Sequence, residues 1–520
     1  MKKQRSRKSR SIYRSQCDEI AAIFDTARSP AKVLCVALDF AKTTHVALIC
    51  DGHGDILKQS IPVHNTGEGV AFLIDQINAS ARRRKIPRKH IFIGGEDIPN
   101  YASNFLFALQ KQNFLVVRVN AHEAKGNREN VTSSTDDLAL LAIAKTLITR
   151  RCRVVERPHD DCSKAVTALG ELTRSRSHFV KVKTATSNMI HSQVEILFPG
   201  FLDSSKSGIT SFGKMSCELM KERFSGPQIA RRKHASLTAE MRRNRIKKPE
   251  QSAAMMIALA KEALPPDKEV VNAAQRALKC EVELYECLKK CEQEQKLAAA
   301  DLLAQTPYVM LTSIQGIALV LASGTGAELG DPARLGPIKS LCGYAGIVRA
   351  TDQTGGPDKP ARGKPTPSRC NHHLKNWAIQ ASQKMKMYGP PEIKERFARW
   401  EVNGQNAKFA GAKRYLRIGR MLIKNGVPYL NAEARQPGAS DEVMAHASEE
   451  AFGILVNKWS GVPGWERMVF AEDRPLGFWR QLAIKMYGAE LPLSGDALPE
   501  AKPDIDIFDD EVSLENEAMI

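Results

Sequence analysis

Apolar and polar residues in the first third of the chain follow the pattern of an α/β domain. Five apolar runs of strand length occur there, at Val33–Leu38, His45–Ile49, Ile56–Val63, His90–Gly95 and Phe114–Val119. The first three follow one another across short turns, whereas segments of helical periodicity separate the later ones. Because a further helix begins at Asp136, the predicted order is β-β-β-α-β-α-β-α.

The pattern changes after residue 156, where apolar positions predict helices and no strands. Val166–Leu197 has the pattern of one long helix that ends before Pro199. Residues 203–250 are basic and show no regular spacing of apolar positions, so we expect an irregular segment there. Val270–Leu303 follows a break at Pro265 and has the apolar spacing of a coiled-coil arm. We therefore predict a helical and coiled-coil region here.

A second compact and mainly helical part is predicted at residues 306–435. Its segment 349–370 is rich in Gly, Pro, Thr, Lys and Arg, and we expect a loop there. The predicted domains are a basic arm at 1–30, an α/β domain at 31–155, the helical and coiled-coil region at 156–305, the part at 306–435, and a C-terminal extension with an acidic tail at 436–520.

Composition favours a protein that binds a polyanion. The 520 residues carry a formal net charge of +18. Nucleic acid is the usual partner of such an excess, although a merely basic or ribosome-associated protein would share it. No apolar run reaches the roughly 18 residues of a membrane span, and no secretory signal is recognisable, so we expect no membrane partner. The 11 cysteines form no CxxC pair, which is usual for reduced thiols.

Three acidic residues lie at the ends of predicted elements. Asp39 and Glu96 follow two of the apolar strands, and Asp136 begins a helix. In a ribonuclease-H-like sheet, which has this order of elements, the three positions lie side by side. Carboxylates that close repel one another unless cations neutralise them, and hard divalent cations prefer carboxylate oxygens. We predict that the three residues bind Mg²⁺ or Mn²⁺ for phosphoryl transfer, although each alone could be a turn residue or a helix cap.

Short motifs in both halves of the chain resemble those of the DEDD transposases of the IS110 family of insertion sequences. In the first half these motifs are Asp39–Lys42, Glu96–Tyr101, Val119–His122 and Ser134–Asp136. In the second half they are Leu311–Ile317, Leu341–Ile347, Thr354–Gly356, and Asn371 with Leu374–Lys375. The resemblance extends over residues 31–200 and 306–430.

This resemblance implies a RuvC-like nuclease domain, a helical arm that mediates oligomerisation, and a C-terminal transposase domain whose serine forms a covalent link to DNA. It also implies that the chain acts on DNA with a structured guide RNA, as a homo-oligomer that is a dimer or a tetramer. The implied activity is that of a DNA transposase or site-specific recombinase. Its implied location is the bacterial cytoplasm, in association with the nucleoid.

Two positions depart from the family pattern. The family has a second Asp three residues after the first on the same helix, whereas this chain has Ala139, and Asp137 points about 100° away. The family's serine precedes a glycine, and here Thr354 takes its place and keeps a hydroxyl for nucleophilic attack. Thr351 and Ser368 are nearby alternatives. We therefore weigh a transposase against a degenerate or domesticated nucleic-acid-binding relative and a DNA invertase.

Basic residues gather in the helical region and in the predicted loop. Dense Arg and Lys with few aromatic residues suit phosphate contacts with duplex DNA or folded RNA better than base stacking, although a solvated helix face has the same composition. The residues that we predict to bind nucleic acid are Arg174, Arg176, Lys181, Lys183, Arg231, Arg232, Arg242, Arg243, Arg362 and Lys364.

Overall fold

The computed structural model divides into two compact units, Met1–Pro158 and His159–Ile520. The residues that it describes are 17–96, 101–128, 135–155, 160–222, 224–348, 350–352, 362–364, 370–404, 406–465 and 468. Residues 1–16 of the predicted basic arm and the predicted acidic tail therefore lie outside the described residues. The rest of the predicted arm is not simply a tail, because Asp18–Ala27 forms helix α1.

A six-stranded sheet forms the centre of the first unit, with the order β3-β2-β1-β4-β5-β6. Strands β2 and β3 extend the sheet as antiparallel neighbours, whereas β4 and β5 run parallel to β1 and β6 runs antiparallel to β5. The strands are β1 (Leu34–Asp39), β2 (Thr44–Asp51), β3 (Ile56–His64), β4 (Ile91–Glu96), β5 (Leu115–Val119) and β6 (Cys152–Val154). The first five confirm the strands predicted from the sequence, and β6 was not predicted.

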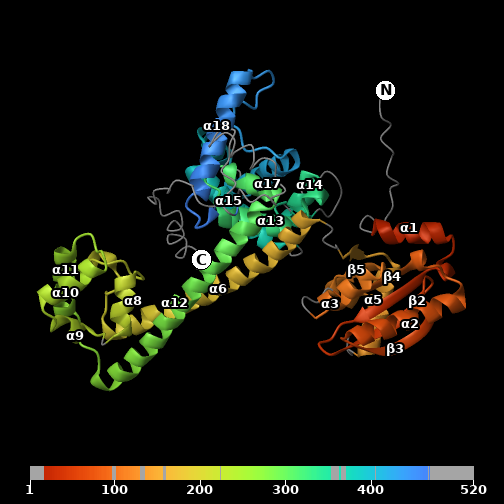
Figure 1. The fold of residues 1–520 in the computed structure, drawn as a ribbon, viewed down its shortest axis with the longest axis horizontal. Helices are drawn as coiled ribbons and strands as arrows, with labels where there is room; N and C mark the ends of the chain where they lie inside the picture. The colour runs from red at the N-terminus through yellow and green to blue at the C-terminus, as the bar shows by residue number, and fades with distance from the viewer. Residues whose placement is uncertain are drawn as a thin grey trace, which may run out of the picture. The chain divides into compact units, whose positions relative to one another are not determined.

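Helices cover both faces of this sheet (Figure 1). Successive residues of β1 point to opposite faces and are apolar on both, so each face needs a covering layer. Val36 and Leu38 pack with α2 and α3 on one face, and Cys35 and Ala37 pack with α1 and α5 on the other. The helices of this unit besides α1 are α2 (Gly67–Arg84), α3 (Ser103–Lys111), α4 (Ala121–Gly126) and α5 (Asp136–Ile148), with short 3₁₀ turns η1 (Pro30–Lys32) and η2 (Arg88–His90). The mixed α/β prediction is thus confirmed for this unit.

Two long helices, α6 (Asp161–Leu197) and α12 (Lys268–Ala304), lie side by side in the second unit (Figure 1). They run antiparallel, because Arg176 of α6 contacts Glu292 of α12, whereas Ile190 packs in one cluster with Leu278. Each helix has 37 residues. The two predicted long helices are confirmed, and we call the pair the arm.

The segment between the two arm helices folds as a small helical head, so the prediction of an irregular segment is wrong. Its helices are α7 (Ser204–Ser207), α8 (Lys214–Lys221), α9 (Gly226–Ala230), α10 (His234–Arg243) and α11 (Pro249–Glu262). Three phenylalanines form its centre, two from the segment just after α6 and one from the segment after α8, with ring centroids 5.5 Å apart for Phe198 and Phe201 and 4.7 Å apart for Phe201 and Phe224. Tertiary packing therefore stabilises helices that are too short to show a period in the sequence.

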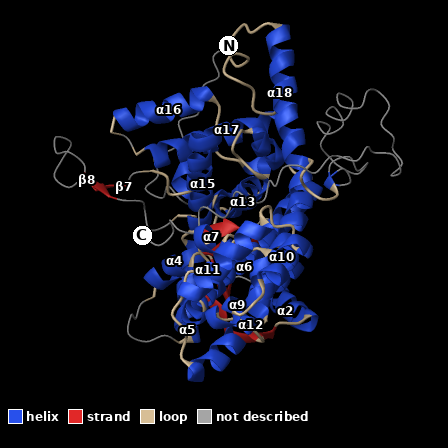
Figure 2. Cartoon of the chain, turned by 90° about the vertical axis from the view of Figure 1, so that its left-hand side faces the viewer, coloured by secondary structure: helices blue, strands red, loops and turns tan. Residues whose placement is uncertain are grey.

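The other end of the arm joins a mainly helical body. Its elements are η3 (Pro307–Ser313), α13 (Leu319–Leu329), η4 (Pro332–Arg334), α14 (Ile338–Tyr344), β7 (Ala350–Asp352), β8 (Arg362–Lys364), α15 (His372–Tyr388), α16 (Pro391–Val402), α17 (Ala407–Asn425) and α18 (Asp441–Trp459). Strands β7 and β8 form a small ribbon (Figure 2), which corrects the prediction of a loop without regular structure. In the described parts of the chain, no helix combines the length and the apolar character needed to cross a bilayer.

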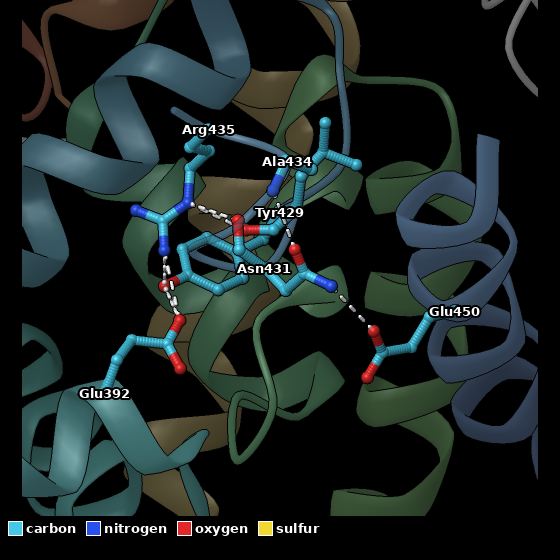
Figure 3. A network of polar contacts seen from close by, with 7 residues as sticks. Glu392, Tyr429, Asn431, Ala434, Arg435 and Glu450 are labelled. Carbon is cyan, nitrogen blue, oxygen red and sulfur yellow. Dashed lines mark hydrogen bonds and ion pairs between the residues drawn. The ribbon is translucent and has the colours of Figure 1, made fainter. Parts of the chain in front are cut away.

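Polar contacts fasten the last part of this body (Figure 3). The Arg435 guanidinium lies 3.1 Å from the Glu392 carboxylate and donates to the Tyr429 hydroxyl at 3.0 Å. The Lys458 ammonium on α18 donates to three backbone carbonyl oxygens at 2.6, 2.7 and 3.0 Å, those of Thr312, Ile314 and Ile317. Because these carbonyls lie at and just after η3, the lysine holds α18 against the start of the body.

Candidate functional site

Two carboxylates lie at the carboxyl ends of neighbouring parallel strands. Asp39 ends β1 and Glu96 ends β4, and the register pairs Leu38 with Gly95 one residue earlier. A Cβ atom at Gly95 would lie 2.3 Å from the Leu38 carbonyl oxygen and 2.3 Å from the Phe40 ring. Glycine is therefore required for the two strand ends to approach each other. The two acidic residues consequently lie at the same end of the sheet.

The third predicted carboxylate lies at the start of α5, which packs against β1 and β2. Asp136 is the first residue of this helix, and the Thr135 hydroxyl accepts a hydrogen bond from the Leu138 backbone N–H at 3.4 Å. A carboxylate at this position is stabilised by the positive end of the helix dipole. The cap and the packing against β1 bring Asp136 toward the end of that strand.

Asp39 interacts with both of the other carboxylates. Burial raises the pKa of Asp39 above its ordinary value, and the neighbouring Asp136 raises it further. Burial also raises the pKa of Glu96, where the repelling charge is that of Asp39. The Arg128 guanidinium acts in the opposite direction and lowers the pKa of both residues. Asp39 is therefore electrostatically coupled to Glu96 and to Asp136, as in carboxylates that share a site.

A buried histidine supports the loop that follows Asp39. The His45 Nδ1 atom accepts a hydrogen bond from the Ala41 backbone N–H at 3.2 Å, and its ring meets Phe40 and Phe105 edge to face at 5.2 and 4.6 Å between centroids. Burial lowers the pKa of His45, which favours the neutral ring that can accept this bond. Sequence reasoning missed this role because His45 lies within an apolar run that was interpreted as a strand.

A second polar group links α13, α14 and α15 in the body of the second unit. Asn371 caps α15 by accepting a hydrogen bond from the Leu374 backbone N–H at 2.9 Å. Its side-chain amide donates to Glu328 at 2.7 Å and to the Tyr344 hydroxyl at 2.8 Å. The structure thus joins Tyr344 and Asn371, which belong to two separate sequence motifs.

The predicted nucleophile lies in sequence between these two motif residues. Strand β7 pairs with β8 so that Asp352 is opposite Arg362, and Lys364 is the last residue of β8. Thr354 belongs to the connection between the two strands and lies outside the described residues. Its proposed role therefore stays a prediction from the sequence.

Two families match the spans of the chain in which these two groups of residues lie. A family model of DEDD transposases of the IS110 type matches residues 36–199, which include the three carboxylates. A second model, of the transposase IS116/IS110/IS902 family, matches residues 308–398, which include Thr354 and Asn371. The chain belongs to the IS110 family of transposases. No curated protein matches the chain.

The transposase has three carboxylates where the family resemblance implies four. Ala139 stands at the place of the second Asp of the helix and is buried. Asp137 does not replace it, because α5 begins regularly and the Asp137 carboxylate accepts a hydrogen bond from the Ser60 hydroxyl of β3. The structure therefore leaves the fourth position without an acidic group.

The metal-binding role predicted for the acidic residues concerns their carboxylate oxygens. Carboxylate oxygens are suitable donors for a hard divalent cation. Among the residues that the structure describes, however, no group of three or more His, Cys, Asp or Glu side chains could hold a metal ion. The Mg²⁺ or Mn²⁺ expected from the sequence therefore stays a prediction.

Two of the predicted nucleic-acid-binding residues form ion pairs with Glu292 inside the arm. Arg176 lies 2.8 Å from one carboxylate oxygen of Glu292, Lys183 lies 2.7 Å from the other, and Lys296 approaches within 3.6 Å. Burial alone would raise the pKa of Glu292, but the hydrogen bond from Lys183 and the charges of all three cations hold it below its ordinary value. Arg176 and Lys183 therefore stabilise the arm, and the expectation that they also contact nucleic acid stays a prediction.

The other predicted basic residues differ in whether they form ion pairs or are exposed to solvent. Arg174 forms an ion pair with Glu328 at 3.6 Å, whereas Lys181 is exposed on the same helix. In the head, Arg232 pairs with Glu240 and Arg242 with Glu250. Six further basic residues of the head are exposed to solvent, and we call them the basic head surface: Arg231, Lys233, Arg243, Arg245, Lys247 and Lys248.

Proposed function

We propose that the transposase cleaves and rejoins DNA strands during DNA transposition, as a site-specific recombinase. The observation that carries this proposal is the coupling of Asp39 to Glu96 and Asp136 at one end of the sheet, within the span that matches DEDD transposases. A carboxylate there orients an attacking hydroxyl by accepting its hydrogen bond. The raised pKa of Asp39 also makes it a better acceptor of the proton that is released.

We infer that the second reactive group is the Thr354 hydroxyl. In this step the Thr354 oxygen attacks a DNA phosphate, a new phosphodiester forms between threonine and one DNA end, and the other end leaves as a hydroxyl. Arg362 and Lys364 are proposed to neutralise the phosphate. The match of the second family model and the hydrogen bond between Tyr344 and Asn371, which flank this segment in the sequence, support the assignment.

The proposed function is tested with the transposase purified together with its native RNA and supplied with element-end DNA. Asp39→Asn is expected to lower strand cleavage about 100-fold or more, because the central carboxylate of the site is lost. Asp137→Asn is the matched control, since this neighbouring acid is bonded to Ser60, and cleavage should stay near the unaltered level. Equal cleavage by the Asp39→Asn variant and the unaltered transposase would contradict the proposal.

DNA and a structured guide RNA are the proposed partners of the basic head surface. Its exposed cations suit the phosphates of a duplex or a folded RNA, which such side chains contact without reading sequence. A Lys247→Gln, Lys248→Gln variant should bind element RNA more weakly and reduce the slope of log affinity against log salt by about 1 to 2. Lys424→Gln, at an exposed position on α17, is the control, and an unchanged slope in the double variant would exclude these residues from the contact.

A homo-oligomer is proposed from an exposed face of α12 that does not contact α6. Residues on this face follow a heptad spacing of three and four and are mostly small or apolar: Val270, Ala273, Ala277, Cys280, Leu284, Cys287, Cys291, Glu294 and Ala298. All are exposed except Cys291, which is half-buried. Glu283 and Lys290 flank this heptad face and lie one heptad apart. In an antiparallel pair of α12 helices, Glu283 of one chain therefore lies beside Lys290 of the other.

The oligomer is tested by measuring the mass of the full chain in solution. Leu284 is 45% exposed at the centre of the heptad face, so Leu284→Lys should convert a dimer or tetramer into a smaller species. Leu264→Lys is the control, because Leu264 is 81% exposed but lies outside α12. If Leu284→Lys leaves the mass unchanged, the heptad face is not the interface.

A nucleic-acid-binding relative without recombinase activity, or a DNA invertase, is the alternative. Ala139 and Thr354 favour the first of these, since both depart from the implied catalytic pattern. Restoring both positions with Ala139→Asp and Thr354→Ser discriminates between the readings. A gain of cleavage from an inactive starting protein would favour the binding relative, whereas full activity of the unaltered chain would dismiss it.

A further inference from the structure

Helix α17 of the body carries an excess of positive charge. Its 19 residues include six Lys and Arg residues and no Asp or Glu. Helices α14 and α15, which pack against α17 (Figure 1), also contain Lys and no acidic residue. In the part of the chain that the structure describes, no ion pair involves α17, and those of the body join other segments, as Lys386 with Glu401 and Arg435 with Glu392.

The charge pattern of α17 differs from that of α12. On α12, Lys290 pairs with Glu294 one turn away, so opposite charges lie next to each other along the helix. On α17, Lys413 and Arg417 are exposed and also one turn apart, and two cations at that spacing repel each other. A solvated helix face explains the pattern of α12 but not that of α17, where a bound anion would remove the repulsion.

Arg414, between these two cations in the sequence, has a hydrogen-bond donor without an acceptor. It is half-buried, and its Nε atom is shielded from solvent and has no acceptor among the described residues. Burial lowers the pKa of Arg414, and the like charges of Arg396 and Arg435 lower it further. The Glu392 carboxylate is bonded to Arg435 and Tyr429 instead (Figure 3). A shielded donor and an unbalanced guanidinium both destabilise the fold unless an anion binds there.

The two helices that contact α17 flank the segment of the proposed nucleophile. Helix α14 ends at Tyr344 and α15 begins at His372, and the residues between them in the sequence include Thr354. The Arg420 Nε atom of α17 donates to the Gly336 carbonyl oxygen, just before α14, at 2.6 Å. Since α17 is thus held against both flanking helices, DNA is the polyanion that we assign to its cations.

We propose that Lys413, Arg414 and Arg417 form a binding site for the phosphate backbone of the DNA substrate, with Arg414 as its central donor. The inference rests on the proposed function in taking DNA as the substrate, and it adds a surface that lies beyond both spans matched by the family models. Spacings of one, three and four residues place the three side chains on adjoining positions of one helix. A guanidinium suits the role because it donates two parallel hydrogen bonds to phosphate oxygens, and such contacts do not depend on base sequence.

The test is the affinity of the full-length transposase for element-end duplex DNA, measured by fluorescence anisotropy over a salt series. Arg414→Met keeps an unbranched stem and should weaken binding about tenfold, with a slope of log affinity against log salt that is lower by about 1. The double variant Lys413→Gln, Arg417→Gln should lower the slope by about 2. Lys424→Gln is the matched control, because it removes a charge from an exposed position about two turns further along the same helix and should change neither quantity.

Thermal unfolding of the same variants separates binding from folding. Arg414→Met should leave the Tm of the second unit unchanged or higher, because the lost charge has no counter-charge. A lower Tm with unaltered DNA affinity would show a structural role and overturn the proposal. If Arg414→Met unfolds the unit, the double variant at exposed positions decides, and an unchanged slope there would overturn it.

Two further comparisons test the site and its ligand. Equal losses of affinity in Arg414→Met and Lys424→Gln would show a general charge effect and not a site. Equal losses for element DNA and for the native RNA would overturn the assignment to DNA. Because anisotropy measures binding and not cleavage, failure here is distinguishable from failure of the proposed function, which is measured by the cleavage activity of Asp39→Asn.

Discussion

At the scale of single residues, the ionised form of Asp39 destabilises the folded first unit. Burial and the charge of Asp136 disfavour the ionised form of Asp39, so its pKa is raised in the folded protein. The folded state then binds a proton more tightly than the unfolded state, and stability is lost as the pH rises through the raised pKa. The ionised form of Asp39 therefore lowers the stability of the folded first unit at neutral pH.

Asp39→Asn is accordingly expected to stabilise the first unit at pH 7. The amide removes the repulsion from Asp136 and Glu96, and the Tm of that unit should rise by roughly 2 °C. The gain should disappear as the pH falls through the raised pKa, because Asp39 is then neutral in the unaltered protein as well. Calorimetry over a pH series measures this, and a lower Tm for the variant at pH 7 would show that Asp39 stabilises the fold.

Lys458 is a second titratable residue whose charge is disfavoured by burial, which lowers its pKa to about 7, but its hydrogen bonds stabilise its surroundings. Lys458→Met should destabilise the second unit by about 2 kcal/mol, because three carbonyl oxygens lose their donor where α18 meets η3. Denaturant unfolding followed by tryptophan fluorescence measures the change, since Trp459 is buried next to this contact. Lys424→Met on α17 is a control at an exposed lysine, and equal effects of the two substitutions would contradict the role of the carbonyl contacts.

At the scale of elements, ion pairs of the Glu292 carboxylate on α12 with Arg176 and Lys183 on α6 hold the two arm helices together. Glu292→Gln should destabilise the second unit by about 3 kcal/mol, because Arg176, Lys183 and Lys296 are then left together without a counter-charge. The pKa of Glu292 is lowered, so its stabilising effect is present above its unfolded pKa and is lost as the pH falls through the lowered value. Unfolding by urea at several pH values should show this difference shrinking in acid.

Glu294→Gln is the matched control for this substitution. Glu294 lies on the same helix but forms only an exposed pair with Lys290 at 4.0 Å, so its loss should change stability by less than about 0.5 kcal/mol. A similar effect of the two substitutions would mean that Glu292 does not act through its three buried cations.

The elements that the sequence predicted well are those in which one periodic pattern continues over many residues. Helices α6 and α12 were predicted because apolar spacing persists along more than 30 positions, and β1 because its residues are apolar on both faces. Helices α8 to α10 were missed because each is short, and they are stabilised by packing around Phe224 and the pair Phe198 and Phe201, which lie more than 20 residues before it. Strand β6 has only three residues, too few for a pattern.

The same distinction applies to the candidate site. Asp39, Glu96 and Asp136 could be found because each lies where a predicted element begins or ends. The burial of Arg176 was missed because its partner Glu292 lies 116 residues away in the sequence, and no local pattern reports such a pairing.

At the scale of the whole molecule, the chain consists of two units with separate hydrophobic cores. We expect calorimetry to resolve more than one unfolding transition, since separate cores need not unfold together. Asp39→Asn should shift only the transition of the first unit and Lys458→Met only that of the second. A single transition that both substitutions shift equally would show that the units unfold cooperatively.

The length of the arm has a mechanical consequence. A helix of 37 residues spans about 55 Å, so the head and the body of the second unit are attached at opposite ends of a stiff lever. A rotation of about 10° at a pivot near the body would carry the head through roughly 10 Å, which is several nucleotide steps along a nucleic-acid strand. Small rearrangements at the base of the arm are therefore amplified into large displacements of the head.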